Sequence, residues 1–295
     1  PEAALTVAAG NRAALLVTAT RADFGGALRF GASGLPAGVT VTGEAMHESV
    51  GQLPLVFEAS AEAAPAGALV ELVGETVDPA LGVRGGLSQS IDLVKYENNP
   101  FYSVSVDRLA VAVARPAPLR VDVDPPAVPM VRMGSMVLPV RVQRAEGFNG
   151  PITVRMLWNP PGIGSGTLEL PPDKSEGGLP LNAARNAAVG TWKIALTATT
   201  DGGGAPIEVA TSLVPLQVAE PFVEFAVQKS RTEQGKGVEV VVKVTQRTPF
   251  DGEIQAQLLG LPGKVAAAPL PVTKDTQELK YALDVPPDAP PGEHN

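Results

Sequence analysis

The chain has 295 residues, of which 31 are glycine and 29 are proline, and it carries a formal net charge of −8. It has no cysteine and only two histidines, His47 and His294, which excludes a disulfide scaffold, a cysteine-ligated metal centre and a thiol nucleophile. No segment is basic and no run of about 18 apolar residues occurs, so neither a nucleic-acid footprint nor a membrane span is predicted.

Three stretches of the chain share one pattern, Phe-x-Gly-x-Leu/Ile, followed by a strand-like segment and a Pro-Gly turn. Each phenylalanine is followed by a later turn glycine at nearly the same distance: 43 residues from Phe24 to Gly67, 42 from Phe148 to Gly190 and 42 from Phe250 to Gly292. This spacing predicts three copies of one unit, with the phenylalanines at equivalent places at the start of the third strand. The alternative is that Pro-Gly turns recur independently in a chain rich in both residues.

Alternating apolar residues predict β-strands along the whole chain. In chain order the clearest cover residues 152–156, 192–198, 238–245 and 279–283. The apolar faces that we expect to meet are Trp192, Ile194 and Leu196 with Ile152, Val154 and Met156, and Val238, Val240, Val242 and Val244 with Leu279, Tyr281 and Leu283. Residues 182–189 come nearest to a helical pattern, but a short turn suffices there. Six or seven strands per copy predict an all-β chain of three tandem Ig-like antiparallel β-sandwiches.

Domain boundaries are expected at residues 97–101 and 220–222, where proline and phenylalanine follow an apolar strand. The predicted sandwiches are therefore 1–98, 99–220 and 221–295, joined by short proline-containing linkers that couple them stiffly. After Gly67 and Gly190 the first two copies hold two more strands, 68–77 with 87–94 and 192–200 with 209–218, whereas three residues follow Gly292. We expect the last sandwich to be incomplete, half open and without its closing hairpin, or filled by a strand of a neighbouring chain, and the natural protein to be longer.

The run from Arg144 to Val154, followed by Pro160-Pro161-Gly162 and by Ala187-Ala188-Val189-Gly190, resembles the Ig-like repeats of large exported bacterial proteins. These are similar to the fibronectin-type and pre-peptidase-associated sandwiches that flank secreted subtilisin-like proteases and surface proteins, notably in planctomycete-type bacteria. The resemblance implies an extracellular or cell-surface setting, with the periplasm as an alternative, and supplies no catalytic residue.

On this basis we predict non-catalytic spacer and interaction repeats, attached to further domains of a longer chain. The partner would be an unidentified protein or cell-surface component, with no nucleic acid, no membrane span and no cofactor. The alternative function is an accessory substrate- or carbohydrate-binding module of a secreted hydrolase such as a subtilisin-like protease. That alternative requires an exposed aromatic cluster, to which Trp158, Phe101, Tyr102 and Phe148 could contribute.

Two glycine-rich motifs are candidates for phosphate binding or for a nucleophile. Residues 162–167 resemble a phosphate-binding loop, but Thr167 replaces the third glycine and no helix is expected to follow, so a loop tip is the simpler interpretation. Residues 31–35 resemble a nucleophile elbow around Ser33 without its closing glycine, with His47 as the one base nearby. His47 is more simply a solvated side chain between acidic neighbours.

Acidic and aromatic residues give the remaining candidates. Asp122, Asp124, Glu146 and Asp201 could supply oxygen ligands for calcium at a domain junction, although their spacing matches no calcium loop. Trp158 either stacks on a partner or covers the end of its sandwich, and Trp192 is expected in the core. No residue is therefore predicted to be catalytic, cofactor-binding or metal-binding.

Overall fold

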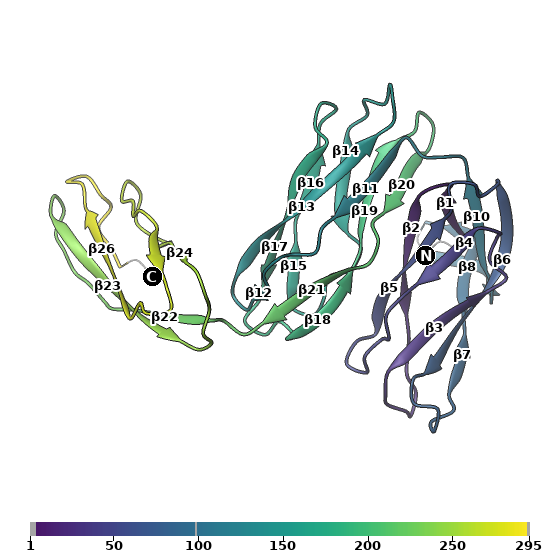
Figure 1. Cartoon of the computed structure of the whole chain (residues 1–295), viewed down its shortest axis with the longest axis horizontal. Helices are drawn as coiled ribbons and strands as arrows, with labels where there is room; N and C mark the ends of the chain where they lie inside the picture. Colours follow the sequence, from purple (N-terminus) through teal and green to yellow (C-terminus); the bar gives the residue numbers. More distant parts are fainter. Residues whose placement is uncertain (1–3, 98, 294–295) are drawn as a thin grey trace. The chain divides into compact units, whose positions relative to one another are not determined.

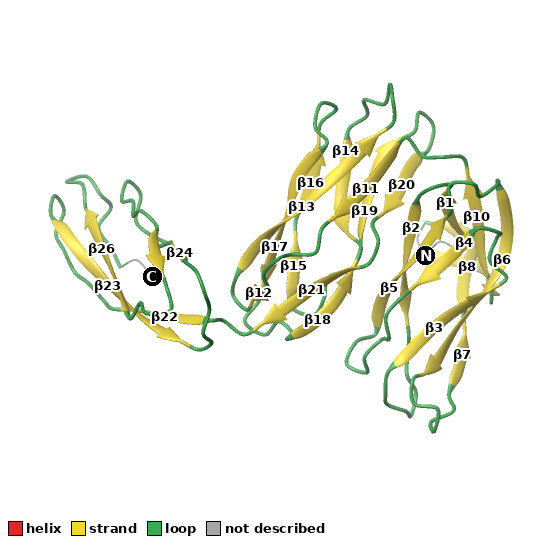
Figure 2. Cartoon of the chain, in the orientation of Figure 1, coloured by secondary structure: helices red, strands yellow, loops and turns green. Residues whose placement is uncertain are grey.

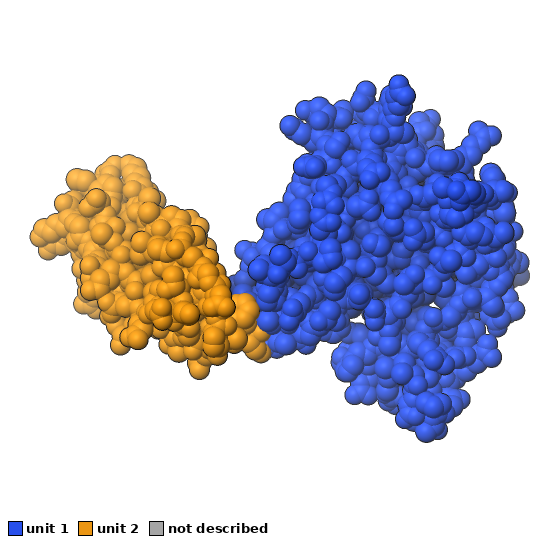
Figure 3. Space-filling model, viewed as in Figure 1, with its two compact units in different colours: residues 1–219 blue, residues 220–295 orange. Residues whose placement is uncertain are grey.

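The computed structural model describes residues 4–97 and 99–293. All regular secondary structure within these ranges is β-strand (Figures 1 and 2). The expected all-β fold is confirmed. The chain divides into two compact units, residues 1–219 and 220–295 (Figure 3). Within the described ranges no helix could cross a membrane.

The first sandwich packs two sheets around Phe57, Leu55, Met46 and Val70. One sheet has the order β1 (Ala4–Ala8), β10 (Leu109–Ala114), β6 (Ala66–Thr76) and β3 (Leu28–Ser33), with β7 (Arg84–Gly86) also paired to β6. The other has the order β2 (Arg12–Thr18), β5 (Gln52–Ala59) and β4 (Val39–Thr42). The β1–β10 ladder is parallel and the other ladders are antiparallel.

The second sandwich also belongs to the first compact unit. One sheet has the order β11 (Leu119–Val123), β13 (Ser135–Arg144), β17 (Glu176–Ala183) and β15 (Ile163–Ser165). A second has the order β16 (Thr167–Leu170), β14 (Ile152–Met156), β19 (Leu196–Asp201) and β20 (Pro206–Ala210). A third has the order β12 (Met130–Val131), β21 (Val214–Ala219) and β18 (Gly190–Ile194). The expected strand 192–198 is interrupted at Ala195, where the chain passes from the sheet of β18 to the sheet of β19. Residues 182–189, whose pattern came nearest to a helix, form the end of β17 and a turn.

Most of the predicted core of this sandwich is confirmed. Ile194 and Leu196 are buried in one cluster with Ile152 and Val154, and Met156 packs half-buried at its edge. Trp192 is also only half-buried, so its expected place inside the core is wrong in part. The reason lies in the contacts between the first two sandwiches, described below.

The second compact unit has five strands in its described residues. They form a sheet of β22 (Val223–Val227), β23 (Gly237–Gln246) and β26 (Glu278–Asp284), and a separate pair of β24 (Ile254–Ala256) and β25 (Leu270–Val272). The expected alternation is confirmed: Val242, Val244, Leu279, Tyr281 and Leu283 are buried, and Val238 and Val240 pack half-buried against them.

The segment from β2 to β7 of the first sandwich recurs in the second at an offset of about 124 residues. Gln52–Ala59 and Glu176–Ala183 differ by 124 at both ends, and the pairing of Glu75 with Arg84 recurs 124 residues later as Thr199 with Glu208. Phe24, Phe148 and Phe250 each pack half-buried against the core of their own sandwich, four residues before β3, β14 and β24. In the second sandwich β14 is the fourth strand rather than the third, because β11 precedes β12, and β12 pairs in parallel with β21 as β1 does with β10.

The first sandwich closes later than the sequence suggested. In the second sandwich three residues separate β20 from the closing strand β21. In the first sandwich the counterpart of β21 is β10, and 22 residues separate it from β7. Among the described residues the intervening strands β8 (Gln89–Tyr96) and β9 (Asn99–Val106) pair with each other and with no other strand. The expected boundary at 97–101 is thus the turn region of an inserted hairpin, although Asn98 itself lies outside the described residues. The alternating segment that suggested a closing strand at 87–94 belongs to that hairpin. The end of the first sandwich, expected at residue 98, therefore lies between Ala114 and Leu119. We call residues 89–106 the inserted ribbon.

One turn recurs in all three sandwiches, and its backbone is left-handed. Gly38 and Gly162 have φ of 78°, and Lys264 has φ of 74° at the matching position. A Cβ atom at Gly162 would lie 2.5 Å from Cα of Ala187, closer than real contacts allow. Glycine is therefore required there by both conformation and space.

We predict that Gly162→Ala destabilises the first compact unit by about 2–4 kcal/mol, because left-handed strain adds to a backbone clash. Gly147→Ala is the matched control, since Gly147 also has φ of 78° but no atom lies within 4 Å of the added Cβ. It should cost about 1 kcal/mol. Urea unfolding of the full chain measures both, and equal losses would show that the clash with Ala187 is relieved at no cost.

Candidate functional site

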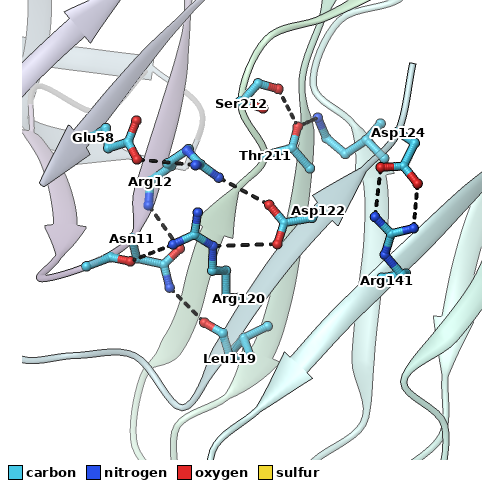
Figure 4. Close-up of polar contacts among 12 residues, drawn as sticks. Asn11, Arg12, Glu58, Leu119, Arg120, Asp122, Asp124, Arg141, Thr211 and Ser212 are labelled. Carbon is cyan, nitrogen blue, oxygen red and sulfur yellow. Dashed lines mark hydrogen bonds and ion pairs between the residues drawn. The ribbon is translucent and has the colours of Figure 1, made fainter. Parts of the chain in front are cut away.

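The first two sandwiches are joined by a buried asparagine (Figure 4). Asn11 follows β1, and its side-chain nitrogen donates to the carbonyl of Leu119 at the start of β11, at 2.7 Å. Its side-chain oxygen accepts from the Arg12 backbone N–H at 2.9 Å. Only 4% of Asn11 is exposed; its bond to Leu119 is buried and costly to lose, and its bond to Arg12 is partly buried.

Charged groups surround this asparagine in Figure 4. Arg12 of the first sandwich contacts Asp122 of the second at 3.3 Å and Glu58 of its own sheet at 3.2 Å. Arg120 contacts the other oxygen of Asp122 at 3.5 Å and donates to the carbonyl of Gly10 at 3.3 Å. The Asp122 carboxylate therefore lies between two guanidinium groups, one from each sandwich.

A seam of small apolar side chains lies beside the charges. Ala14 and Val56 are cross-strand partners on the outer face of β2 and β5, and they form one buried cluster with Ala195 and Ala210 of the second sandwich. Side chains this small let the two backbones approach closely. Thr211, fully buried, accepts from the Leu196 N–H at 3.0 Å and fixes the turn that follows Ala210.

Both tryptophans of the chain contribute to the same junction. Trp158 and Trp192 meet edge to face, with ring centroids 6.0 Å apart, and both pack half-buried against the core cluster of the first sandwich. The Trp192 indole N–H donates to the carbonyl of Ala188 at 2.9 Å. Trp158 thus covers the neighbouring sandwich rather than standing free, and Trp192 is shared by two cores instead of filling one.

Three of the four acidic residues considered for calcium are bound by other groups of the protein. Asp122 is held by Arg12 and Arg120, and Asp124 is bound bidentately by Arg141, whose hydrogen bonds hold the pKa of the Asp124 carboxyl below its ordinary value of 3.8. Asp201 accepts the N–H of Gly203 at 2.8 Å, closing its own turn. Glu146 is exposed in a turn. Within residues 4–97 and 99–293 no group of three histidine, aspartate or glutamate side chains is placed to hold a metal.

The residues considered for a hydrolase are likewise engaged locally. Ser33 donates to Glu71 at 3.2 Å, whereas the Nδ1 atom of His47 lies 2.8 Å from the hydroxyl of Ser49 and accepts the Ser49 N–H. Within residues 4–97 and 99–293 no hydrogen bond joins Ser33 to His47, and His294 lies outside these ranges. The interpretation of residues 162–167 as a loop tip is wrong, because β15 and β16 flank Gly166 as the chain crosses between two sheets.

The inserted ribbon carries several exposed aromatic side chains. Tyr96, Phe101 and Tyr102 are 68%, 71% and 59% exposed. Two register shifts near the end of the hairpin leave Leu93 and Phe101 without cross-strand partners, and Leu93 is also exposed. β-Bulges of this kind re-aim side chains and are frequent at functional positions.

Sequence reasoning named Phe101 and Tyr102 as possible contributors to an aromatic cluster but assigned them to a linker. Tyr96, Leu93 and the ribbon itself were missed. The available signal was the unusual distance from Arg84 to the next strand able to close the sheet. At the hairpin's middle, Ser103 donates to Asp92 at 2.6 Å and Lys95 lies 3.1 Å away. These contacts lower the pKa of the Asp92 carboxyl and tie the two strands together.

Comparison with known proteins assigns the chain to no family. No protein-family model matches the chain. No curated protein matches it either. Among solved structures it is similar to the fibronectin(III)-like modules of CbhA from Clostridium thermocellum, with 11% sequence identity, 74% of this chain and 92% of that chain covered, and a TM-score of 0.23. The assignment as β-sandwiches therefore rests on the strand pairing itself.

We predict that Asn11→Ala lowers the free energy of unfolding of the first compact unit by about 1–3 kcal/mol, because the Leu119 carbonyl and the Arg12 N–H lose their buried partner. Arg29→Ala is the control: its ion pair with Glu75, at 3.6 Å, is exposed and should contribute no more than about 0.5 kcal/mol. Denaturant unfolding distinguishes them, and equal effects would mean that water satisfies the groups around Asn11.

Proposed function

We propose that the chain is a non-catalytic structural and interaction module of an exported bacterial protein, extracellular or at the cell surface, and part of a longer multidomain chain. In this proposal its first two sandwiches act as one stiff spacer that displays the inserted ribbon. The observation that carries the proposal is the junction around Asn11, where hydrogen bonds, ion pairs and a buried apolar seam join two sandwiches that each have their own core. Freely jointed modules would leave these surfaces wet and polar.

Two further observations support this role. The side chains best suited to acid–base or nucleophilic chemistry, among them Asp124, Asp201 and His47, are each bound by near neighbours. The offset of 124 residues between the first two sandwiches favours descent from one repeated unit, as in the Ig-like repeats that the sequence resembles.

The stiffness of the link between the first two sandwiches can be measured directly, because a chain without cysteine accepts spin labels only where cysteines are introduced. Leu69→Cys on β6 and Val137→Cys on β13 place labels at exposed sites on the two sandwiches. We predict one narrow distance distribution by pulsed electron resonance. Adding Asn11→Ala and Asp122→Ala should broaden it, whereas adding Arg29→Ala should not. A broad distribution in the otherwise native chain would refute the spacer role.

The second candidate is an accessory carbohydrate- or substrate-binding module, favoured by the exposed Tyr96, Phe101 and Tyr102 of the ribbon. Aromatic rings offer a flat apolar face with, for tyrosine, a polar edge, which suits a sugar ring.

We predict for this candidate that the full chain binds members of a glycan array and that Phe101→Ala with Tyr102→Ala removes the signal, with the midpoint of unfolding nearly unchanged. Leu69→Ala is the matched control, since Leu69 is 70% exposed but lies on β6, outside the ribbon. A chain that binds no glycan leaves the spacer function intact and eliminates this second candidate.

A further inference from the structure

A cleft of about 470 Å³ lies where the first two sandwiches meet, beside the two tryptophans. Its lining comes from both sandwiches: most of residues 44–50 with Leu53 and Pro54 from the first, and Trp158 with residues 188–193 from the second. Clefts of roughly this size at the interface between domains are the usual places for small ligands. The cleft is therefore a candidate binding site that neither sandwich forms alone.

The wall from the first sandwich is held in place by Arg21. Its guanidinium group donates to the carbonyls of Val50 at 3.0 Å, Met46 at 3.1 Å and His47 at 3.2 Å. Met46 is also fixed through its backbone, because its N–H and carbonyl both bond to Leu28. The loop that bears His47 is thus ordered without a ligand.

The wall from the second sandwich is fixed as well. Trp192 and Lys193 belong to β18 and lie in its ladder with β21. The Trp192 indole N–H donates to the carbonyl of Ala188, and the Ala188 N–H donates to the carbonyl of Pro161, both at 2.9 Å. Because both walls are already ordered, binding in the cleft costs little conformational entropy.

The lining combines an aromatic surface with a small set of polar groups. Trp158 and Trp192 are only half-buried, so part of their ring surface is accessible. The polar groups include the Glu44 carboxylate, the Lys193 ammonium group and the His47 imidazole. The two charges cancel, and the site therefore favours a ligand without net charge.

The ion pair of Glu44 and Lys193 connects the two walls but leaves both groups able to bind a ligand. Its N–O distance of 3.8 Å is longer than the roughly 2.7–3.2 Å of a direct hydrogen bond. A hydroxyl group can satisfy both partners, because it accepts from the ammonium group and donates to the carboxylate. A carbonyl group only accepts, so it can satisfy Lys193 but not Glu44.

His47 adds a donor of known position on the ring. Its Nδ1 atom accepts the Ser49 backbone N–H at 3.1 Å, so the hydrogen of the neutral imidazole is on Nε2. Among the described residues no hydrogen bond uses this Nε2–H group. It is available to the oxygen of a ligand hydroxyl.

We propose that this cleft binds a neutral saccharide. One sugar ring places its C–H face against the accessible indole surface, while its hydroxyls bridge Glu44 and Lys193 and accept from His47. A proline-rich peptide would also suit an aromatic surface, but its prolines have no N–H to donate to Glu44. The bound sugar contacts both sandwiches, so this function is additional to the spacer role and independent of the inserted ribbon.

The test uses the full chain and its own fluorescence, because Trp158 and Trp192 are the two tryptophans of the sequence. The probes are maltotriose, cellotriose, xylotriose and N-acetylchitotriose, titrated separately and repeated by calorimetry. We expect a saturable change in tryptophan emission, with binding heat, for at least one of these sugars.

Glu44→Ala should weaken the binding of that sugar about tenfold, because a hydrogen bond to a charged group is lost. Glu62→Ala is the matched control: it removes the same charge from an exposed position of the same sandwich, outside the cleft, and should leave the affinity unchanged. Both glutamates are exposed, so both variants are expected to fold as the native chain does.

Four outcomes would overturn the proposal. The first is no saturable response to any of the sugars, and the second is an unchanged affinity in the Glu44→Ala chain. The third is loss of binding with Phe101→Ala and Tyr102→Ala, which would place the sugar on the ribbon. The fourth is saturable binding of a tetraproline peptide and of no sugar. None of these results changes the distance distribution between labels at residues 69 and 137 in the free chain, so failure here is separable from failure of the spacer role.

Discussion

The peptide groups along the edge of a β-strand need hydrogen-bond partners, and this requirement organises all three sandwiches. In the first, β6 is long enough to pair with β10 near its start and with β3 and β7 further along. In the second, the same run is divided into β18 and β19 at Ala195, so that each half serves a different sheet. In the described part of the second compact unit, β24 pairs with β25, and Ile254 is partly exposed.

The junction between the first two sandwiches follows from a second constraint, the cost of burying charge. The Asp122 carboxylate is partly exposed and lies between Arg12 and Arg120, whereas the Arg12 side chain is 12% exposed and would be costly to leave unpaired. A divalent cation could neutralise the same carboxylate, yet arginine also offers several donors and a long apolar stem. The arginines therefore connect the sandwiches while the alanine-lined seam excludes water. Ala14 and Ala210 make that close approach possible because larger side chains would hold the sheets apart.

The period-two pattern predicted the sheets well, because alternation reflects which face of a strand is buried. The faces of Val242 and Val244, and of Leu279 and Leu283, followed directly from it. Alternation does not say which strand closes a sheet, however. Residues 89–94 and 109–114 both alternate, and only pairing with β1 and β6 distinguishes the second as the closing strand.

The junction between the first two sandwiches could not be predicted from the sequence, for a related reason. Asn11 and Leu119 are separated by 108 residues, and no local pattern links them. Ala14 and Val56 resemble ordinary core residues in sequence, although they face the neighbouring sandwich. Trp158 and Trp192 were assigned to their own sandwich because periodicity describes one strand at a time. The half-buried state of Trp192 reflects two cores in contact.

The inserted ribbon lies where an extra segment disturbs the fold least. It connects β7 to β10, whose counterparts β20 and β21 are joined by only three residues, so the strands it connects keep their pairing with or without it. Loop-closure entropy rises slowly with length, which makes such an insertion inexpensive in free energy. A hairpin needed only for connection would be expected to expose polar side chains, since apolar ones favour aggregation. Exposed Tyr96, Phe101 and Tyr102 contribute nothing to the core, so their presence is better explained by contact with another molecule than by the stability of the sandwich.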